Sequence, residues 1–315
     1  MPCRDLAVPE RYVIGIDGGA SKTVGILGDS SGKIIAKGTI GPSNFHNIGI
    51  AAAQEAITSI VSQVQRKAHL SERKLDFATV ALAGVDSSRD KRVAERFVGE
   101  AKIARRSMVV HDSLAALEAA FPGGPGIIVI SGTGCVAAGM NEEGAYFRAG
   151  GWGYLVDDEG SAYDIGRKGL RAAFRAIDGR SSPTKLVSIF KHRFRVRELG
   201  DALNKIYSDG LTVEEVGRLA LLVSDALPDG ACKQILNDAG ISLAELACCV
   251  ASKLNMGGRQ VKVAIFGGTF KSGKYLLNSF KKRIRREYPL AEITQPRIEP
   301  ALGAFWLAVS QSRLK

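Results

Sequence analysis

The chain has 315 residues, a length that suits two domains. Hydrophobic residues make up 45% of it, and no run approaches the ~18 consecutive apolar residues that span a membrane, so we expect a cytoplasmic globular protein without a membrane partner. The net charge of +11 is concentrated in short runs at 66–74, 191–198 and 281–287, the last two within amphipathic patterns; these predict solvated helix faces and no nucleic-acid partner.

The termini and the cysteines exclude further classes. Residues 1–11 carry charges and prolines where a signal peptide needs an apolar core, so we expect a flexible leader. The five cysteines are scattered without a C-x-x-C pair, which argues against a zinc or disulfide framework and favours small apolar residues on buried faces. They are Cys3, Cys135, Cys232, Cys248 and Cys249.

The first half of the chain opens with a β-hairpin. The stretch "YVIGIDGGASKT" (12–23) reads as a buried strand that runs into a glycine-rich turn, and "DSSG" (29–32) makes the next turn before a third strand. Helical and strand patterns then alternate. We predict a helix at 50–68, a strand at 77–84, a helix at 91–103, a strand at 107–112 and a helix from 113.

The second half repeats this plan from Gly126. "GIIVIS-GTGC-VAAG" again places a glycine-rich turn between two strands, and a long helical insertion follows at about 161–255. A strand at 261–266, a turn "GGTFKSG" and a helix come next, and a last helix at 299–311 packs back across the domain boundary. The predicted domains are 12–120, joined by the C-terminal helix 300–315, and 121–299 with its insertion.

The first glycine-rich turn has the composition of a phosphate site. Gly18 and Gly19 are expected to permit positive φ and close backbone approach, so that successive amides form an anion-binding nest. Asp17 at the end of its strand can hold Mg²⁺ through water. Ser21, Lys22 and Thr23 can add donors. This is not a Walker A loop, because G-x-x-x-x-G-K-[ST] is absent, and a plain hairpin remains the alternative.

The second glycine-rich turn matches a dinucleotide-binding motif by its letters alone. Residues 132–137, "GTGCVA", match the dinucleotide fingerprint G-x-G-x-x-A, but that fingerprint must open a helix. Here a turn signal, "NEEG", follows within a few residues, and the segment reads as a hairpin. We therefore reject a dinucleotide site and expect a second phosphate-binding hairpin.

Several motifs in order resemble the sugar kinase/hsp70/actin superfamily, and within it the N-acetylglucosamine kinase and archaeal hexokinase group of the BadF/BadG-type ATPase family. The motifs are "GIDGGASKT", "GPSNFHNIG", "HDSLAAL", "ISGTGCVAAG", "GGWGYLVDDEGSAYDIGRKGL", "FGGTFKSG" and "EPALGA". Ala20-Ser21 and Cys135 depart from the usual residues without changing charge. The resemblance implies an α/β fold of two ribonuclease-H-like (actin-like ATPase) domains facing across a nucleotide- and sugar-binding cleft, ATP and Mg²⁺ as substrate and cofactor, and a homodimer.

The same resemblance implies site residues. It implies that the β- and γ-phosphates are bound by Gly132, Thr133 and Gly134. It also implies that the adenosine is bordered by Gly267, Gly268, Lys271 and Ser272. It implies that the sugar is bound by Asn44, Asp112, Gly151, Trp152 and Asp158. In the loop "VDDEG" the resemblance assigns the sugar contact to Asp158 and not to the adjacent Asp157. For Trp152 a core role is an equal alternative.

Asp112 has two interpretations. A carboxylate at the end of a buried strand and the start of a helix is most commonly an N-cap. In the resembling family it is the general base that takes the proton of a sugar hydroxyl. His111 is expected to be a local hydrogen-bonding residue.

The expected function is an ATP-dependent hexokinase or N-acetylglucosamine kinase that phosphorylates the 6-hydroxyl of a hexose or N-acetylhexosamine. One alternative is an ATPase that activates a partner dehydratase through an iron–sulfur cluster, which would need suitably placed cysteines from two chains. Another is a non-enzymatic nucleotide- or nucleic-acid-binding protein, against which the presence of both Asp112 and Asp158 argues.

Overall fold

The computed structural model describes residues 11–208, 210–257 and 260–314. The chain divides into two compact units, with residues up to 124 and from 297 onward in unit 1 and residues 125–296 in unit 2. Apart from Arg11, the predicted leader lies outside the described residues.

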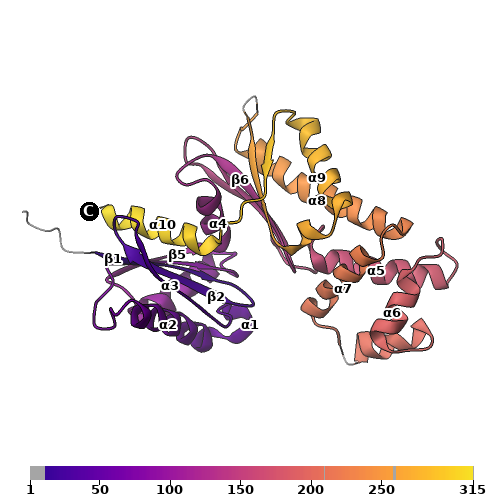
Figure 1. The fold of residues 1–315 in the computed structure, drawn as a ribbon, viewed down its shortest axis with the longest axis horizontal. Helices are drawn as coiled ribbons and strands as arrows, with labels where there is room; N and C mark the ends of the chain where they lie inside the picture. The colour runs from indigo at the N-terminus through magenta and orange to yellow at the C-terminus, as the bar shows by residue number, and fades with distance from the viewer. Residues whose placement is uncertain (1–10, 209, 258–259, 315) are drawn as a thin grey trace, which may run out of the picture. The chain divides into compact units, whose positions relative to one another are not determined.

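Unit 1, whose strands are drawn in indigo to purple in Figure 1, contains a sheet. This sheet has five strands in the order β3-β2-β1-β4-β5. The first three strands form an antiparallel meander, and β4 and β5 run parallel to β1. Each predicted strand is present within one to two residues of its core, which confirms the hairpin followed by parallel strands. The strands are β1 (Tyr12–Gly18), β2 (Thr23–Asp29), β3 (Ile34–Ile40), β4 (Phe77–Leu82) and β5 (Arg106–His111).

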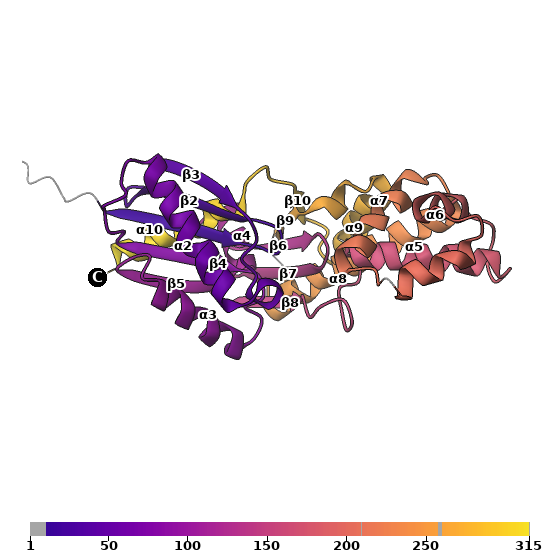
Figure 2. The same ribbon diagram turned by 90° about the horizontal axis from the view of Figure 1, so that it is seen from below.

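Helices cover both faces of this sheet because its central strands are apolar on both sides. Ile14 and Ile16 pack with α2 and α3, which Figure 2 shows on one face, while Val13 packs with Phe305 of α10 on the other. Gly15 lets α10 approach β1 closely, since a Cβ at this position would lie 2.0 Å from the backbone nitrogen of Phe305. The helices are α1 (Phe45–Ile48), α2 (Ile50–Lys67), α3 (Ser88–Ala101), α4 (Asp112–Ala120) and α10 (Pro300–Arg313).

Unit 2 repeats the strand plan. Its sheet has the order β10-β9-β6-β7-β8, again an antiparallel meander followed by two parallel strands, so the predicted repeat of architecture is confirmed. The sequence had not indicated the short edge strand β10. The strands are β6 (Gly126–Ser131), β7 (Cys135–Met140), β8 (Tyr146–Gly150), β9 (Lys262–Phe266) and β10 (Glu292–Thr294).

The predicted helical insertion is present in unit 2 and is built around α8. This helix is long and apolar enough to cross a membrane by length and composition, but eleven of its residues are buried and pack into the core of unit 2. The basic run 281–287 lies on α9, whose apolar side buries Leu276, Phe280 and Ile284. The helices are α5 (Ala162–Ile177), α6 (Leu186–Phe194), α7 (Val213–Asp225), α8 (Gly230–Lys253) and α9 (Lys274–Glu287), with short turns η1 (Leu199–Ala202), η2 (Asn204–Ser208) and η3 (Gly268–Lys271).

Candidate functional site

In unit 1 the strand register brings two carboxylates to one edge of the sheet. Gly18 pairs with Leu82, and Leu82 pairs with His111, so these three residues form one row across β1, β4 and β5. Asp17 precedes this row by one residue and Asp112 follows it by one. The carboxyl ends of parallel strands thus carry both acids, as expected for a ligand site in a sheet of this kind.

The environment of Asp17 opposes its negative charge. Burial is the largest cause that raises its pKa from 3.8 to about 7, and the nearby negative charge of Asp112 raises it further. Lys22 lowers the pKa, whereas Glu299, at the start of α10, raises it. A carboxylate in this setting gains from a nearby cation, because opposite charge offsets both burial and repulsion.

Asp112 is the first residue of α4, but it does not cap the helix. The N-cap is His111, whose Nδ1 accepts the Ser113 N–H at 3.1 Å, so the N-cap interpretation of Asp112 is wrong. Asp112 Oδ1 lies 2.9 Å from the same Nδ1. Because that nitrogen already accepts a hydrogen bond, it has no proton to donate, and Asp112 Oδ1 is buried without a hydrogen-bond partner among the described residues. His111 is the local hydrogen-bonding residue that we expected.

The first glycine-rich turn is shaped by packing rather than by backbone strain. Neither Gly18 nor Gly19 has a positive φ, so that expectation was wrong. Gly18 is required instead because a Cβ would lie 2.3 Å from Ser43 Oγ. Gly19 N donates to Lys22 O at 2.9 Å, which closes the turn. The conformation of this turn therefore depends on Ser43 in the loop before α1.

The side chains of this turn differ in accessibility. Ser21 and Lys22 are exposed and can reach a ligand. Thr23 is fully buried, and its hydroxyl donates to Ser43 Oγ at 2.8 Å, so the expectation that it donates to a phosphate is not met in this conformation. Asn44 uses its Oδ1 to accept the His46 N–H at 3.0 Å as the N-cap of α1. Its amide group remains as a donor.

In unit 2 the same sheet edge gathers the second glycine-rich turn and its neighbours. Ser131 pairs with Cys135, Ile130 with Phe266, and Val136 with Gly150. The loop 132–134, the turn that begins at Gly267 and the loop that begins at Gly151 therefore lie side by side. The hairpin interpretation of 132–137 is confirmed, since β7 and not a helix follows the turn.

The turn after β9 packs directly on this loop. Gly267 has a φ of 101°, and a Cβ there would lie 1.9 Å from Ser131 O, so only glycine fits. Thr269 is buried, with its hydroxyl 3.4 Å from Gly132 O. Gly268 meets no described atom within 4 Å of an added Cβ, so we find no packing requirement for glycine there. Lys271 is exposed and Ser272 is buried.

Asp158 lies beneath the second loop. It is 6% exposed, has a φ of 68°, and its Oδ1 accepts the Cys135 N–H at 2.8 Å. Burial raises its pKa, while the Cys135 hydrogen bond lowers it. Gly134 is packed against the same carboxylate, because a Cβ at 134 would lie 2.9 Å from Asp158 Oδ2. Asp158, predicted to bind the sugar, and the loop 132–134, predicted to bind the phosphates, are thus in direct contact.

We expect Gly134→Ala to lower the melting temperature, because the new methyl group must displace the Asp158 carboxylate. Overpacking of this kind typically destabilises by ~1–3 kcal/mol. Gly132→Ala is the matched control, since a Cβ there meets no described atom within 4 Å. Thermal unfolding of both variants measures the difference, and equal melting temperatures would contradict the close packing of loop 132–134 on Asp158.

Trp152 is 63% exposed, so the core alternative is wrong. Its backbone N–H donates to Asp157 Oδ2 at 3.1 Å, and its ring lies under the guanidinium of Arg148. Gly150 and Gly151 before it have φ values of 76° and 77°, which glycine adopts readily. These two glycines let the chain leave β8 sharply.

Two supporting residues, Ser43 and Asp164, were not predicted from the sequence. Ser43 holds the first turn through Thr23 and the close approach to Gly18. Asp164 is 3% exposed at its side chain, accepts the Gly160 N–H at 3.0 Å, and pairs with Arg167 and Lys168. The pattern "SAYD" at 161–164, with Ser161 as N-cap of α5, was a readable signal for Asp164; Ser43 had none, because its contacts are long-range.

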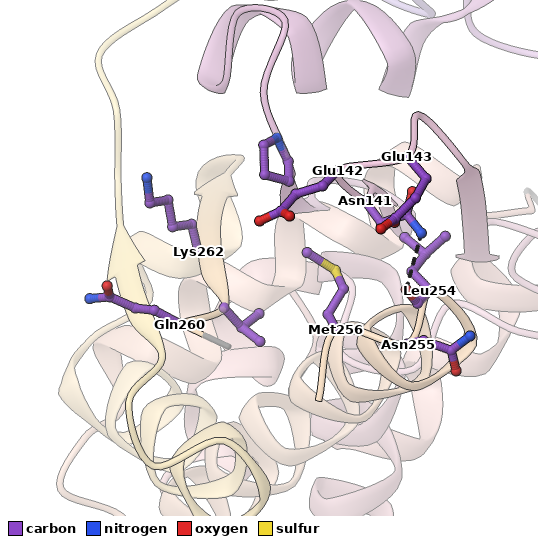
Figure 3. A pocket seen from close by; sticks show the side chains of 10 residues that line it. Asn141, Glu142, Glu143, Leu254, Asn255, Met256, Gln260 and Lys262 are labelled. Atoms are coloured by element: carbon purple, nitrogen blue, oxygen red, sulfur yellow. Dashed lines mark hydrogen bonds between the residues drawn. The ribbon is translucent and has the colours of Figure 1, made fainter. Parts of the chain in front are cut away.

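A cavity of about 680 Å³ lies at the other edge of the unit 2 sheet (Figure 3). Asn141, Glu142 and Glu143 come from the turn between β7 and β8, and Lys262 opens β9. Since these positions are at the opposite ends of the strands from Ser131, this cavity is separate from the predicted site residues of unit 2.

Comparison with known proteins agrees with this geometry. The chain is 32% identical over 303 residues to an N-acetylmuramic acid/N-acetylglucosamine kinase of Clostridium acetobutylicum, covering 96% of this chain and 99% of that one. It is 30% identical over 313 residues to an N-acetyl-D-glucosamine kinase of Dictyostelium discoideum, covering 95% and 98%. A crystal structure of a putative N-acetylglucosamine kinase from Chromobacterium violaceum is similar with a TM-score of 0.77, 28% identity and coverage of 95% and 99%.

A family match covers nearly the whole chain as well. Residues 14–308 match the BadF/BadG/BcrA/BcrD ATPase family, and this range includes all of both sheets except the first two residues of β1, and all of the helical insertion. The resemblance inferred from the motifs is confirmed. The chain belongs to the BadF/BadG/BcrA/BcrD ATPase family.

Proposed function

We propose that this protein is an ATP-dependent sugar kinase that transfers the γ-phosphate of ATP to the 6-hydroxyl of a hexose or N-acetylhexosamine. Similarity over nearly the full length to kinases of N-acetylglucosamine and N-acetylmuramic acid supports this activity and this substrate class. Glucose, mannose and glucosamine remain candidate acceptors beside the acetylated sugars.

The observation that carries the mechanism is the buried oxygen of Asp112. Phosphoryl transfer needs little covalent chemistry from the protein, but it needs a residue that orients the attacking hydroxyl and accepts its proton. Asp112 Oδ1 has no hydrogen-bond partner among the described residues, so an acceptor is ready at the carboxyl end of β5. A sugar hydroxyl donated to this oxygen would satisfy it.

The remaining roles follow from accessibility. The phosphates would be bound by the loop of Gly132, Thr133 and Gly134. They would also be bound by the first turn, with Gly18, Gly19 and the exposed side chains of Ser21 and Lys22. Gly267, Gly268, Lys271 and Ser272 would border the adenosine. The sugar would be held by Asp112 and the Asn44 amide of unit 1 and by Asp158, Gly151 and Trp152 of unit 2.

Mg²⁺ fits the donor set of unit 1. Asp17 has a pKa raised by burial and by Asp112, and a divalent cation would offset both effects. Within the described ranges no group of three or more His, Cys, Asp or Glu side chains is placed to hold a metal ion. Mg²⁺ needs no such cage, since it commonly binds through one or two carboxylates, water and substrate phosphates. Bound there, it would neutralise charge on the phosphates.

The dehydratase-activator alternative gains no support from the thiols. Cys135, Cys232 and Cys248 are buried, and burial is the largest cause that raises the pKa of each thiol. Among the cysteines that the structure describes, Cys249 alone is exposed. A cluster ligand must be an accessible thiolate, so these residues are poorly suited to bridge two chains.

We expect Asp158→Ala to raise the sugar KM sharply and the ATP KM less, since the variant also removes the acceptor of the Cys135 N–H beside loop 132–134. Leaving sugar hydroxyls unpaired in a buried site typically costs ~1–3 kcal/mol each, or about tenfold to a hundredfold in KM. Asp157→Ala is the comparison on the adjacent residue; because its carboxylate accepts the Trp152 N–H, we expect a smaller rise in the sugar KM from that variant. Steady-state kinetics that place the sugar defect in Asp157→Ala instead would show that the position of the sugar acid in this loop is wrong.

Turnover across glucose, mannose, glucosamine, N-acetylglucosamine and N-acetylmuramic acid tests the proposal. We expect ADP and a sugar 6-phosphate in equal amounts with at least one acetylated sugar, identified by mass and by phosphorus NMR. Absence of a phosphorylated sugar across the panel would overturn the kinase proposal.

We further propose that the protein is a cytoplasmic homodimer. Light scattering should then give twice the chain mass of 33.5 kDa.

A further inference from the structure

His111 caps α4 with a nitrogen and not with an oxygen. Its Nδ1 accepts the Ser113 N–H at 3.1 Å and lies 2.6 Å from Ser113 Oγ. The side chains that most often cap a helix are those of Asn, Asp, Ser and Thr, whose oxygens always carry lone pairs. Each nitrogen of a neutral imidazole is either a donor or an acceptor, so His111 caps α4 only as the tautomer with its proton on Nε2.

Asp86 selects this tautomer. It lies between β4 and α3, and its Oδ1 is 3.1 Å from His111 Nε2. A carboxylate only accepts hydrogen bonds, so it favours a proton on the nitrogen that faces it. The ring nitrogens of His111 therefore have complementary partners, since Nε2 donates to Asp86 and Nδ1 accepts from Ser113. The bond that one ring nitrogen makes sets the protonation of the other.

The tautomer matters for Asp112, because Asp112 Oδ1 lies 2.9 Å from His111 Nδ1. With the proton on Nε2, the ring gives no hydrogen to this oxygen, which agrees with its lack of a hydrogen-bond partner among the described residues. With the proton on Nδ1, the ring would present an N–H group beside both the Ser113 N–H and Asp112 Oδ1. The cap would then be lost, and the ring would compete with the sugar hydroxyl for the proposed base.

The loop that carries Asp86, residues 83–86, also contacts two further predicted site residues of unit 1. Its first N–H donates to Gly18 O at 2.9 Å. Gly84 has a φ of 88°, and a Cβ there would lie 3.0 Å from Asn44 Oδ1. These contacts hold the loop at the carboxyl ends of β1 and β4, so we expect a substitution of the Asp86 side chain to leave the backbone in place.

We propose that Asp86 is a positioning residue for phosphoryl transfer: it holds His111 as the Nε2–H tautomer, which caps α4 and leaves the Asp112 carboxylate to the sugar hydroxyl. This inference rests on the proposed kinase function and deepens it. In this role Asp86 acts through His111 and not through contact with a substrate. Carboxylates that orient a metal-bound histidine in this way typically change affinity or activity by ~10- to 100-fold, and we expect an effect of the same size here.

Nitrogen NMR of the imidazole rings reads the tautomer directly and needs no substrate. The chain has four histidines, so ¹⁵N-histidine labelling gives four ring systems, and His111→Asn identifies the signals of His111. With the rings neutral, we expect the Nε2–H tautomer of His111 in the wild type. We expect the Nδ1–H tautomer to become populated in Asp86→Asn, because an amide both donates and accepts and no longer selects between the two.

Kinetics test the consequence for turnover. We expect Asp86→Asn to reduce kcat about 10- to 100-fold and to leave the KM for ATP within about twofold. In His111→Asn the amide oxygen can cap α4 without a choice of tautomer, so adding Asp86→Asn to that variant should change kcat by less than about twofold. Asp76→Asn is the matched control with the wild-type kcat, because Asp76 directly precedes β4 at its other end and pairs with Arg105.

Three results would overturn this role and leave the kinase function intact. They are an Nδ1–H tautomer of His111 in the wild type, full kcat in Asp86→Asn, and an equal loss from Asp86→Asn in the His111→Asn background. The last would show that Asp86 acts on the loop itself and not through His111. A wild type that phosphorylates no sugar of the panel would overturn the kinase function and this role with it. If Asp86→Asn does not fold, Asp86→Ser takes its place in both measurements, since a hydroxyl also donates and accepts.

Discussion

Asp112→Asn is expected to reduce kcat by a factor of ~10²–10⁴, the range that general acid–base catalysis typically supplies, while ATP and sugar still bind. The amide keeps the size of the side chain and removes the proton acceptor. Asp112 Oδ1 is buried without a hydrogen-bond partner among the described residues, so its loss as an acceptor should be felt in turnover more than in folding. Steady-state kinetics and calorimetric titration of both substrates measure the two effects separately.

A helix-start carboxylate in the other unit provides the control for this variant. Glu215 lies in the first turn of α7 and belongs to a capping box with Thr212, so Glu215→Gln tests the helix-capping contribution alone. We expect that variant to retain its kcat. If Asp112→Asn keeps more than about a tenth of the wild-type kcat, then Asp112 is not the base, and its place at the start of α4 has a structural reason only.

Asp17→Asn should abolish most Mg²⁺-dependent turnover and yet stabilise the protein in the absence of metal. The loss follows from removing the carboxylate that we propose as the metal-directed group, since metal stabilisation of phosphoryl charge is worth several kcal/mol. The gain follows from removing a buried charge whose pKa is raised to about 7 by burial and by Asp112. Kinetics at several Mg²⁺ concentrations and thermal unfolding without metal test the two parts.

The pH dependence fixes the sign of the stability effect. A carboxyl whose pKa rises from 3.8 unfolded to about 7 folded holds its proton more tightly in the folded state. Its contribution to the free energy of unfolding is therefore present below pH 4 and is lost as the pH rises toward 7, by up to about 4 kcal/mol. The melting-temperature gain of Asp17→Asn should thus be large at pH 8 and small near pH 4.

Asp29→Asn is the control with the opposite sign. Hydrogen bonds, first from the Ser31 side chain, hold the pKa of Asp29 below its usual value, so its ionised form stabilises the fold at neutral pH. That variant should melt lower than the wild type at pH 8. If Asp17→Asn also melts lower at pH 8, the buried carboxylate has a compensating partner, and the proposed cation site loses its main support.

Local sequence patterns predicted the fold well, because the signals are short-range. Two apolar strands joined by a glycine-rich turn recur at 12–29 and 126–140, and helical periodicity marks α2 and the insertion. The edge strand β10 was missed because three residues with one half-buried side chain give no alternation to read. The packing of the C-terminal helix back onto the first half of the chain was predicted, but its partners on the sheet of unit 1, such as Val13 for Phe305, were not.

The site was predicted as a set of residues but not as a set of contacts. Glycine at 18 looked like a conformational requirement and is a steric one, imposed by Ser43 from 25 positions along the chain. The position of Thr23, the support of Cys135 by Asp158 and the stacking of Arg148 on Trp152 likewise depend on tertiary packing. Propensity and motif spacing carry no information on such pairs.

Phosphate transfer with and without sugar tests the central claim most directly. With γ-labelled ATP, Mg²⁺ and N-acetylglucosamine or another sugar of the panel, we predict label on the sugar in a one-to-one ratio with ADP. Without sugar we predict ATP hydrolysis at a small fraction of that rate, since the nucleophile that Asp112 would orient is missing. Equal hydrolysis with and without every sugar, and no labelled sugar, would contradict the account and favour an ATPase that acts on a partner protein.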